Sequence, residues 1–436
     1  MAASFLASVW LAVHNSFEHE VEKLNKQGLK KYINIYAKWV KDDGDKEEHP
    51  SISFFKNIEL YIYSVLLLLS TFLWMALPYN SGPDMAIQKW VGAIRLLIPD
   101  RHKPAPGEVI FIDVSKSRYL VPQNEDSTEN DVITNRKYLT ELFNFLAANN
   151  NQVKYVLCDV NFDIPTPDDS ALIQSISELH DKFLSIDAYT NDSLVKNVAG
   201  VRSATASVYL QEDAVYKIPF FGSYGDSLVP FKMYMDLDKG NVRKNFLFTW
   251  FSGKGIAFNN QINDYPVRSN DFTGGGYVKI GLGELVSVMK LSPEIFTQYL
   301  QNRYLLIGDF ENDRHDTYMD AQQGTLILFN AYWHLHLNRQ LLSVWYLIIL
   351  YIFLHWIVWL QTGEISRQLR LTLKVKYFEP FEFPVNILSV SFLLITFTYL
   401  SSLLFNVNIS IFHLIAIFSL VDFVKFIRSK RIKTKH

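Results

Sequence analysis

Four long apolar runs constrain this chain more than any other feature of its 436 residues. They occupy residues 60–78, 341–360, 384–405 and 409–427 and carry almost no charge. Each is close to the ~20 residues that an α-helix needs to cross the hydrocarbon core of a membrane. Tryptophan and tyrosine lie near the ends of the runs, as they do at membrane interfaces. The sequence therefore predicts four transmembrane helices, at 58–78, 341–361, 384–405 and 409–427.

Basic residues predict how these helices are oriented. The loop 362–383 contains Arg367, Arg370, Lys374 and Lys376, and the tail 428–436 reads RSKRIKTKH. By the positive-inside rule both are cytoplasmic, and so is the N-terminal segment 1–57. We therefore expect a multi-pass protein of the cytoplasmic (inner) membrane, embedded in the lipid bilayer, with both termini in the cytoplasm. The large segment 79–340 then lies outside, in the periplasm.

The N-terminal segment contains an amphipathic pattern. Apolar residues recur at helical spacing and form one stripe. The stripe consists of Leu6, Trp10, Val13, Phe17, Val21 and Leu24. It indicates either a helix that docks on a partner or on the membrane surface, or a helix packed within its own chain.

The segment 79–340 alternates between strand and helix patterns. Residues 108–114, 153–163 and 303–309 are short apolar runs typical of strands buried on both faces. Amphipathic helices are expected between them, for example at 136–150, where apolar residues recur on one face. Such an order predicts an α/β domain with a mostly parallel sheet and flanking helices. The single cysteine, Cys158, lies in the second strand and indicates a structural thiol.

Several stretches of the segment resemble a known family. These are VIFIDV at the first strand, YVLCDVNFD followed by DDSAL at the second, and YLLIGDFENDRHDTY with GTLILFNAYWHL near the end. Their order, together with one apolar run before the domain and three after it, resembles the CHASE2 family. Those domains are extracytoplasmic sensory modules of bacterial membrane receptors. The resemblance implies a sensory domain, although no kinase or cyclase output module follows the last run.

Acidic residues crowd the ends of the predicted strands. The candidate ligand site consists of Asp113, Asp159, Asp163, Asp309, Asp313, His315 and Asp316. Open α/β sheets bind ligands at the carboxyl ends of their strands, and carboxylates with one imidazole suit Mg²⁺, Mn²⁺ or Ca²⁺. Strand-end aspartates also commonly cap turns and helices. The resemblance favours this second interpretation, so we assign no metal, no cofactor and no catalytic residue.

Two further segments bear on a signalling role. DFTGGGYVKIGLG, residues 271–283, has five glycines but no phosphate-loop ending, so a flexible loop is expected. Residues 324–340 predict a helix that continues directly into the second apolar run. A ligand at the strand ends is expected to tilt this helix and so carry a signal.

Three functions follow from these observations. The first is a sensory input subunit that receives a ligand or protein cue and acts on a separate effector. The second is a scaffolding subunit of a cell-envelope complex, and the third is a membrane-anchored metal-dependent hydrolase. We expect the first of these, which is a non-enzymatic role. Its partner is then a separate effector, and the chain is also a candidate to form a homo-oligomer. The formal net charge of −2 gives no indication of a nucleic-acid partner.

Overall fold

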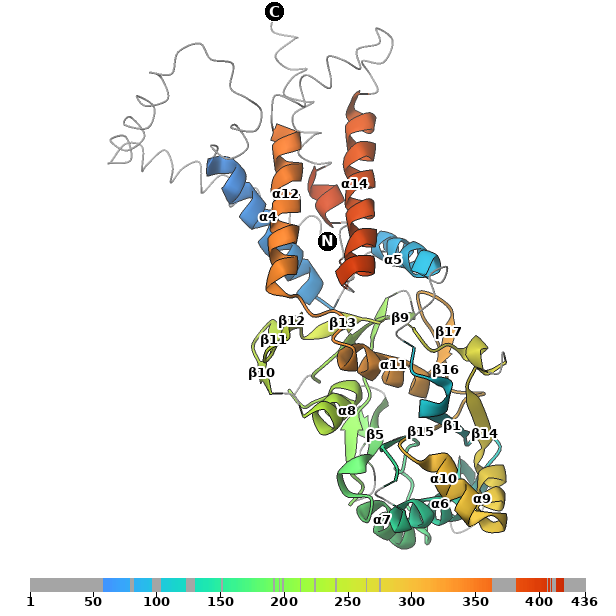
Figure 1. Ribbon diagram of the computed structural model, residues 1–436. Coiled ribbons are helices and arrows are strands. Elements are labelled where there is room, and N and C mark those ends of the chain that lie inside the picture. The colour runs from blue at the N-terminus through green and yellow to red at the C-terminus, as the bar shows by residue number, and fades with distance from the viewer. Residues whose placement is uncertain are drawn as a thin grey trace, which may run out of the picture. The chain divides into compact units, whose positions relative to one another are not determined.

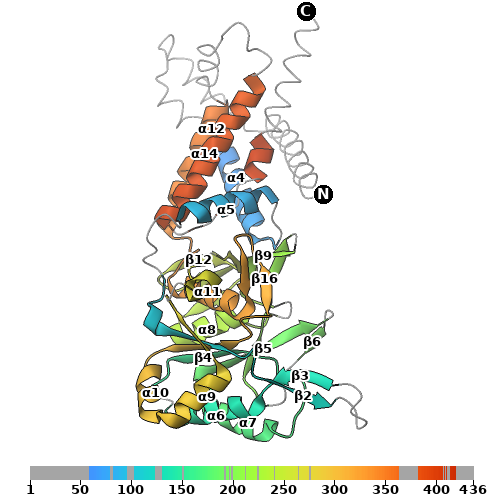
Figure 2. The ribbon, with the colours of Figure 1, turned by 90° about the vertical axis from the view of Figure 1, so that its right-hand side faces the viewer.

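The computed structural model of the chain (Figures 1 and 2) describes most of its residues. The described residues are 58–78, 82–95, 103–122, 130–149, 152–190, 193–195, 197, 200–211, 213–222, 225–239, 241–263, 265–273, 276–362, 382–405, 407, 409 and 413–418. The expected N-terminal helix, most of the basic loop 362–383 and the tail 428–436 lie outside them.

The chain divides into two compact units. We call them the helical unit and the α/β unit. The helical unit comprises Met1–Trp74, Trp345–Phe397 and Ser410–His436, and the α/β unit comprises Met75–Val344 and Thr398–Ile409.

The described part of the helical unit belongs mainly to three long helices, α4 (Ile58–Ala76), α12 (Val344–Thr362) and α14 (Glu382–Phe405). The Ser64 hydroxyl of α4 lies 2.9 Å from Nδ1 of His355 in α12. The Phe353 ring of α12 stacks on Phe397 of α14 with 3.8 Å between the ring centroids. Polar and aromatic contacts therefore join these helices.

No helix among the described residues is both long and apolar enough to cross a membrane. This finding contradicts the four transmembrane helices predicted from the sequence and the multi-pass location in the inner membrane that depended on them. Two of the runs show that an uncharged stretch of sequence is not the same as an uninterrupted helix. The start of the second run is extended, because Leu342 forms a β-bridge with Ile256. Only 413–418 of the fourth run is helical among its described residues.

The α/β unit is built on a seven-stranded sheet in the order β14-β1-β15-β4-β5-β6, with β7 also pairing β5. Each pair in it is parallel except β5 with β6. The strands are β1 (Val109–Asp113), β4 (Tyr155–Asp159), β5 (Phe183–Thr190), β6 (Ser193–Val195), β7 (Ser203–Thr205), β14 (Val278–Gly281) and β15 (Tyr304–Gly308). The mostly parallel α/β sheet expected from the sequence is thus present, with β1, β4 and β15 at the predicted places.

Helices cover both faces of this sheet (Figure 2). Because side chains alternate along a strand, Ile110 and Ile112 of β1 enter one core and Val109 and Phe111 the other. The first core is covered by α6 (Arg136–Ala148), α7 (Asp169–Ser177), α9 (Leu282–Leu291) and α10 (Pro293–Leu300). The second is covered by α8 (Val229–Asp238) and α11 (Gly324–His336). Every residue of β1 and β15 is consequently buried.

Smaller elements surround the sheet. Antiparallel pairing joins β2 to β3, β8 and β13 to β9, β10 and β12 to β11, and β16 to β17. Their bounds are β2 (Arg118–Pro122), β3 (Asn130–Thr134), β8 (Tyr209–Gln211), β9 (Ala214–Pro219), β10 (Val242–Lys244), β11 (Phe248–Phe251), β12 (Gly255–Phe258), β13 (Asn260–Ile262), β16 (Arg314–Asp316) and β17 (Ala321–Gln323). One further helix, α5 (Gly82–Arg95), and three 3₁₀ turns, η1 (Pro106–Glu108), η2 (His180–Lys182) and η3 (Ser269–Phe272), complete the named elements.

The helix expected at 324–340 does not continue into the second apolar run. It ends as α11 at His336, and α12 begins only at Val344. Asn338 and Gln340 adopt left-handed backbone, with φ of 54° and 63°, which terminates a helix. The expectation that a tilt of one continuous helix carries the signal is therefore wrong.

A buried cation joins three segments at one end of the first core. Arg136, the first residue of α6, is 0% exposed. Its Nε lies 3.6 Å from Oδ1 of Asp169 in α7, and its Nη2 donates to the Asn161 carbonyl at 3.3 Å. The guanidinium also lies over the Phe162 ring, 4.4 Å from the centroid. Burial lowers the pKa of Arg136, because the charged form loses water.

We expect Arg136→Met to lower the free energy of unfolding by about 3 kcal/mol, because Asp169 would lose its buried cation. Lys137→Met is the matched control, since Lys137 is the exposed neighbour on the same helix and should change stability by less than ~0.5 kcal/mol. Urea unfolding of the intact chain measures both. Equal stability of the two variants would show that the Arg136 contacts contribute nothing.

Candidate functional site

The strands β1, β15 and β4 end side by side. Asp113 pairs with Gly308 and Gly308 pairs with Asp159, so the three residues form one row across the sheet. A side chain at Gly308 would collide with the Thr325 hydroxyl, which occupies the space between the two aspartates. The two strand-end carboxylates expected from the sequence thus lie at one edge, separated by a glycine.

Asp113 at the end of β1 is held by several donors. Its carboxylate accepts the N–H groups of Ser115 and Phe310 at 3.0 Å and 3.2 Å, and the Lys279 ammonium at 3.2 Å. Burial acts to raise the pKa of Asp113, but the hydrogen bonds outweigh it and hold the pKa below its ordinary value. Asp113 therefore stays charged, and its carboxylate oxygens already have hydrogen-bond donors.

Asp309, directly after β15, holds a tight turn. Its carboxylate accepts the N–H groups of Glu311 and Asn312 at 3.1 Å and 2.8 Å, and it pairs with Arg118 of β2. These contacts are those of a turn-capping aspartate. At this position the capping interpretation of the acidic stretch describes the geometry.

Asp159 and Asp313 approach the same point at the first residue of α11. A Cβ atom at Gly324 would lie 3.3 Å from Asp159 Oδ2 and even closer to Asp313 Oδ2. The Thr325 hydroxyl donates to Asp159 at 2.8 Å, and His315 Nε2 lies 2.9 Å from Asp313 Oδ1. Burial, reinforced by the charge of Asp313, raises the pKa of Asp159 to about 7. The bond to Asp313 raises the pKa of His315, so this group holds protons near neutral pH.

The remaining predicted residues do not join these groups. Asp163 is exposed in the loop after β4, where its charge interacts with that of Arg136. Asp316 is exposed in β16. Among the residues that the structure describes, no three His, Cys, Asp or Glu side chains are grouped so that they could hold a metal ion. Asp113 and Asp309 are therefore separate carboxylates with partners of their own, whereas Asp159 and Asp313 approach each other beside Gly324.

An open pocket of about 520 Å³, which we call the cavity, lies one strand further out, against the edge strand β14. This volume falls within the range of small-molecule sites. Its walls come from η3 and the loop after it, from β14, and from the β16–β17 hairpin that follows β15. The lining residues are Ser269, Asn270, Phe272, Thr273, Tyr277, Val278, Lys279, Arg314 and Gln323.

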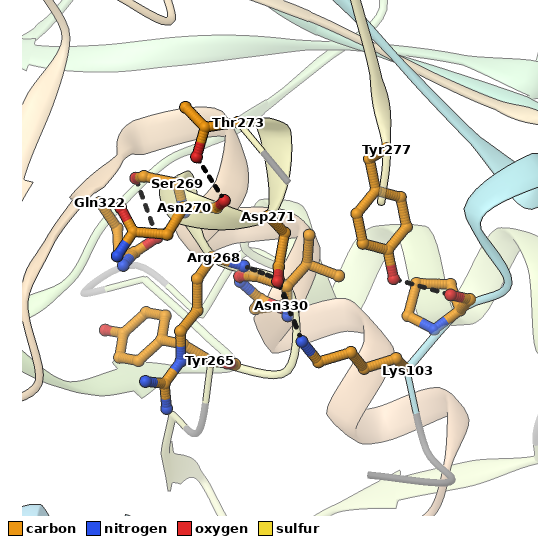
Figure 3. A network of polar contacts seen from close by, with 12 residues as sticks. Lys103, Tyr265, Arg268, Ser269, Asn270, Asp271, Thr273, Tyr277, Gln322 and Asn330 are labelled. Carbon is orange, nitrogen blue, oxygen red and sulfur yellow. Dashed lines mark hydrogen bonds and ion pairs between the residues drawn. The ribbon is translucent and has the colours of Figure 1, made fainter. Parts of the chain in front are cut away.

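Figure 3 shows the polar network that holds the η3 wall in place. The Asp271 carboxylate accepts the Arg268 N–H at 2.8 Å and the Lys103 ammonium at 3.1 Å and 3.2 Å. The Tyr277 hydroxyl donates to the Pro104 carbonyl at 2.7 Å. The segment before β1 thus fixes both η3 and the start of β14, and the wall is built before any ligand arrives.

A second set of bonds connects the cavity to α11. The Ser269 hydroxyl donates to Gln323 Oε1 at 2.7 Å, and Gln323 Nε2 donates to the Phe310 carbonyl at 3.2 Å. Gln323 is also the N-cap residue of α11. A displacement of this cavity wall would therefore reach the start of α11.

Sequence reasoning missed this cavity, because Lys279 lies in the glycine-rich stretch 271–283 that was expected to be a loop. The structure places Val278–Gly281 in the central sheet as β14. The β-branched residues of VKI, Val278 and Ile280, were a signal for a strand, although three residues are few for recognition. Arg314 follows the predicted strand 303–309 and was passed over in favour of its acidic neighbours.

Comparison with protein family models gives no match, and neither do comparisons with curated proteins and with solved structures. The resemblance to the CHASE2 family therefore stays an expectation from the sequence.

We expect Asp159→Asn to change how stability depends on pH. Because folding raises the pKa of Asp159, the folded wild type holds an extra proton between about pH 4 and pH 7, and its stability falls as pH rises through that window. The asparagine variant lacks this loss. Between pH 4 and pH 8, the free energy of unfolding of wild type should therefore fall by about 2–4 kcal/mol more than that of the variant. Chemical unfolding at both pH values measures the difference.

Asp316→Asn is the matched control, because Asp316 is an exposed carboxylate on the neighbouring hairpin. Its pH profile should run parallel to that of wild type. A parallel profile for Asp159→Asn as well would contradict the buried, proton-sharing arrangement around Gly324.

Proposed function

We propose that this chain is a non-enzymatic signal-input subunit. Its α/β unit binds a small molecule in the cavity beside β14 and passes the event to a separate effector. The resemblance to the CHASE2 sensory family supports an input role, and the cavity supplies a place for a ligand.

The position of the cavity supports this proposal. Ligands of open α/β sheets bind where the chain leaves the carboxyl ends of the strands. Arg314 and Gln323 belong to the segment that leaves β15, and they form one wall of the cavity. Lys279 forms the opposite side from the edge strand β14.

The single observation that carries the proposal is that hydrogen bonds from the two walls meet at one residue, Phe310. Lys279 bonds to Asp113, which accepts the N–H of Phe310. Gln323 donates to the carbonyl of the same Phe310. The Phe310 ring is 3% exposed and packs edge-on against Phe111 of β1. A ligand that moves either wall thus acts on a residue anchored in the core under α11.

An exposed hairpin favours scaffolding as the second candidate. Phe246 is 93% exposed and Trp250 is 52% exposed, both at the β10–β11 hairpin. Exposed aromatic residues in one place are typical of surfaces that bind other proteins. A scaffold would use this hairpin without any ligand in the cavity.

A ligand panel tests the proposal on the intact chain. We would measure the Tm with succinate, succinamide, 1,4-diaminobutane, benzoate, benzamide and benzylamine, which vary charge at similar size. At least one should raise the Tm, since a ligand at 100 times its Kd stabilises the folded state by about 2.7 kcal/mol. Hydrogen exchange should then slow at the amides of residues 323–325, where α11 begins.

Asn270→Trp, which fills the cavity from its exposed rim, should abolish the rise in Tm. Lys137→Trp is the control, because it places the same ring on the exposed face of α6, in the layer that covers the other face of the sheet. No shift with any member of the panel would sink the input proposal and favour the scaffold. A shift that persists in Asn270→Trp would place the ligand elsewhere.

A further inference from the structure

The cavity beside β14 carries charge of one sign. Among the residues that line it, Lys279 and Arg314 are cationic, and none is acidic. Lys279 is paired with Asp113, which lies outside the lining, at 3.2 Å. Arg314 therefore supplies the positive charge that no described carboxylate pairs, and this charge attracts anions.

Besides Asp113, which holds Lys279, two carboxylates beside lining residues of the cavity are engaged with other partners. Asp271 is turned toward Lys103 and the Arg268 N–H (Figure 3). Asp313, next to Arg314 in the chain, pairs with His315. These acidic groups are therefore not free to neutralise the cavity cations.

The two cations still have donors to offer. The Arg314 side chain is exposed, and no ion pair between described residues includes it. Lys279 bonds only to Asp113 among its described partners, at 3.2 Å, and an ammonium has three N–H groups. A guanidinium offers a planar pair of N–H groups that matches a carboxylate or phosphate.

The other lining residues determine what kind of group can lie beside the anionic group of a ligand. Phe272 and Val278 supply apolar surface, and Asn270 supplies an amide at the rim. The hydroxyls of Ser269 and Thr273 are already donating, to Gln323 and to the Asn270 carbonyl. The cavity thus suits a compact anion and offers some apolar surface beside the charged group.

We propose that the ligand of this site is a small oxyanion, a molecule bearing a carboxylate or phosphate group. Arg314 binds this group, and Lys279 donates to it in competition with Asp113. This inference rests on the proposed function and adds the chemical class of the ligand. The oxyanion competes with Asp113 for Lys279, so binding loosens the link between β14 and the end of β1.

Isothermal titration of the intact chain, at constant ionic strength, tests the ligand class. The probes are succinate, inorganic phosphate, neutral succinamide and cationic 1,4-diaminobutane. We expect one of the two oxyanions to bind and the neutral and cationic probes not to bind. Tighter binding of succinate identifies a carboxylate, and tighter binding of phosphate identifies a phosphate group; both results support the proposal.

Variants locate the binding. Arg314→Gln and Lys279→Gln should each weaken the oxyanion at least about tenfold, because each removes a charge-assisted hydrogen bond. Arg243→Gln is the matched control, since Arg243 is an exposed arginine of β10 that does not line the cavity, and it should leave the Kd unchanged. Arg314 and Lys279 are both exposed, so the variants should fold, which their Tm verifies.

Three outcomes overturn the inference. If Arg243→Gln weakens succinate or phosphate as much as Arg314→Gln does, the attraction is general charge. If succinamide or 1,4-diaminobutane binds more tightly than both oxyanions and is displaced by Asn270→Trp, the input function stands but the ligand class is wrong. If neither succinate nor phosphate binds and benzoate does not raise the Tm, the class is also wrong, and the neutral and cationic members of the ligand panel decide the input function separately.

Discussion

The burial of the central sheet on both faces controls where this molecule can place polar groups. β1 and β15 are buried at every position, and the only charged side chain in these two strands is that of Asp113, the last residue of β1. Asp113, Gly308 and Asp159 form the row at that edge. The row closes because its middle member has no side chain, which leaves space for the Thr325 hydroxyl to reach Asp159.

This edge of the sheet is rich in acidic residues, but local partners offset much of their negative charge. Asp113 shares its charge among two backbone N–H groups and one ammonium. Asp159 is held partly protonated near neutral pH by burial and by Asp313. Asp309 is used within its own turn. Lys279 is the ammonium that Asp113 holds, whereas no ion pair between the described residues includes Arg314, so the charge of Arg314 stays available.

The elements predicted from the sequence were those with strong local patterns. β1, β4 and β15 were recognised as unbroken apolar runs, and α6 by its apolar face, which is buried through Leu139, Leu142, Phe143 and Leu146. Carboxylates at the strand ends followed from the same pattern, because residues after parallel strands must meet at one edge.

What could not be predicted depends on pairing between distant segments. Strand β14 is four residues long and is recognisable mainly by its register with β1, which sets Lys279 beside Phe111 and lets its ammonium reach Asp113. The break between α11 and α12 depends on left-handed backbone at Asn338 and Gln340 and on the bridge from Leu342 to Ile256. Hydropathy alone predicted membrane helices that no described helix supports.

The contacts of Asp113 lower the free-energy cost of moving the Lys279 ammonium from Asp113 to a ligand. Hydrogen bonds from Ser115, Phe310 and Lys279 lower the pKa of Asp113, so Lys279 is only one of the groups that stabilise the carboxylate anion. If the ammonium turns toward a ligand, Asp113 keeps the N–H groups of Ser115 and Phe310 and is not left unpaired. The Phe310 N–H then stays bonded to Asp113, whose link to β14 is released, while Gln323 still holds the Phe310 carbonyl. Gln323 is the N-cap residue of α11, and Tyr332 of that helix bonds to Tyr304 of β15 at 2.9 Å. Of the two helices that cover the second core, α11 is therefore the one placed to respond.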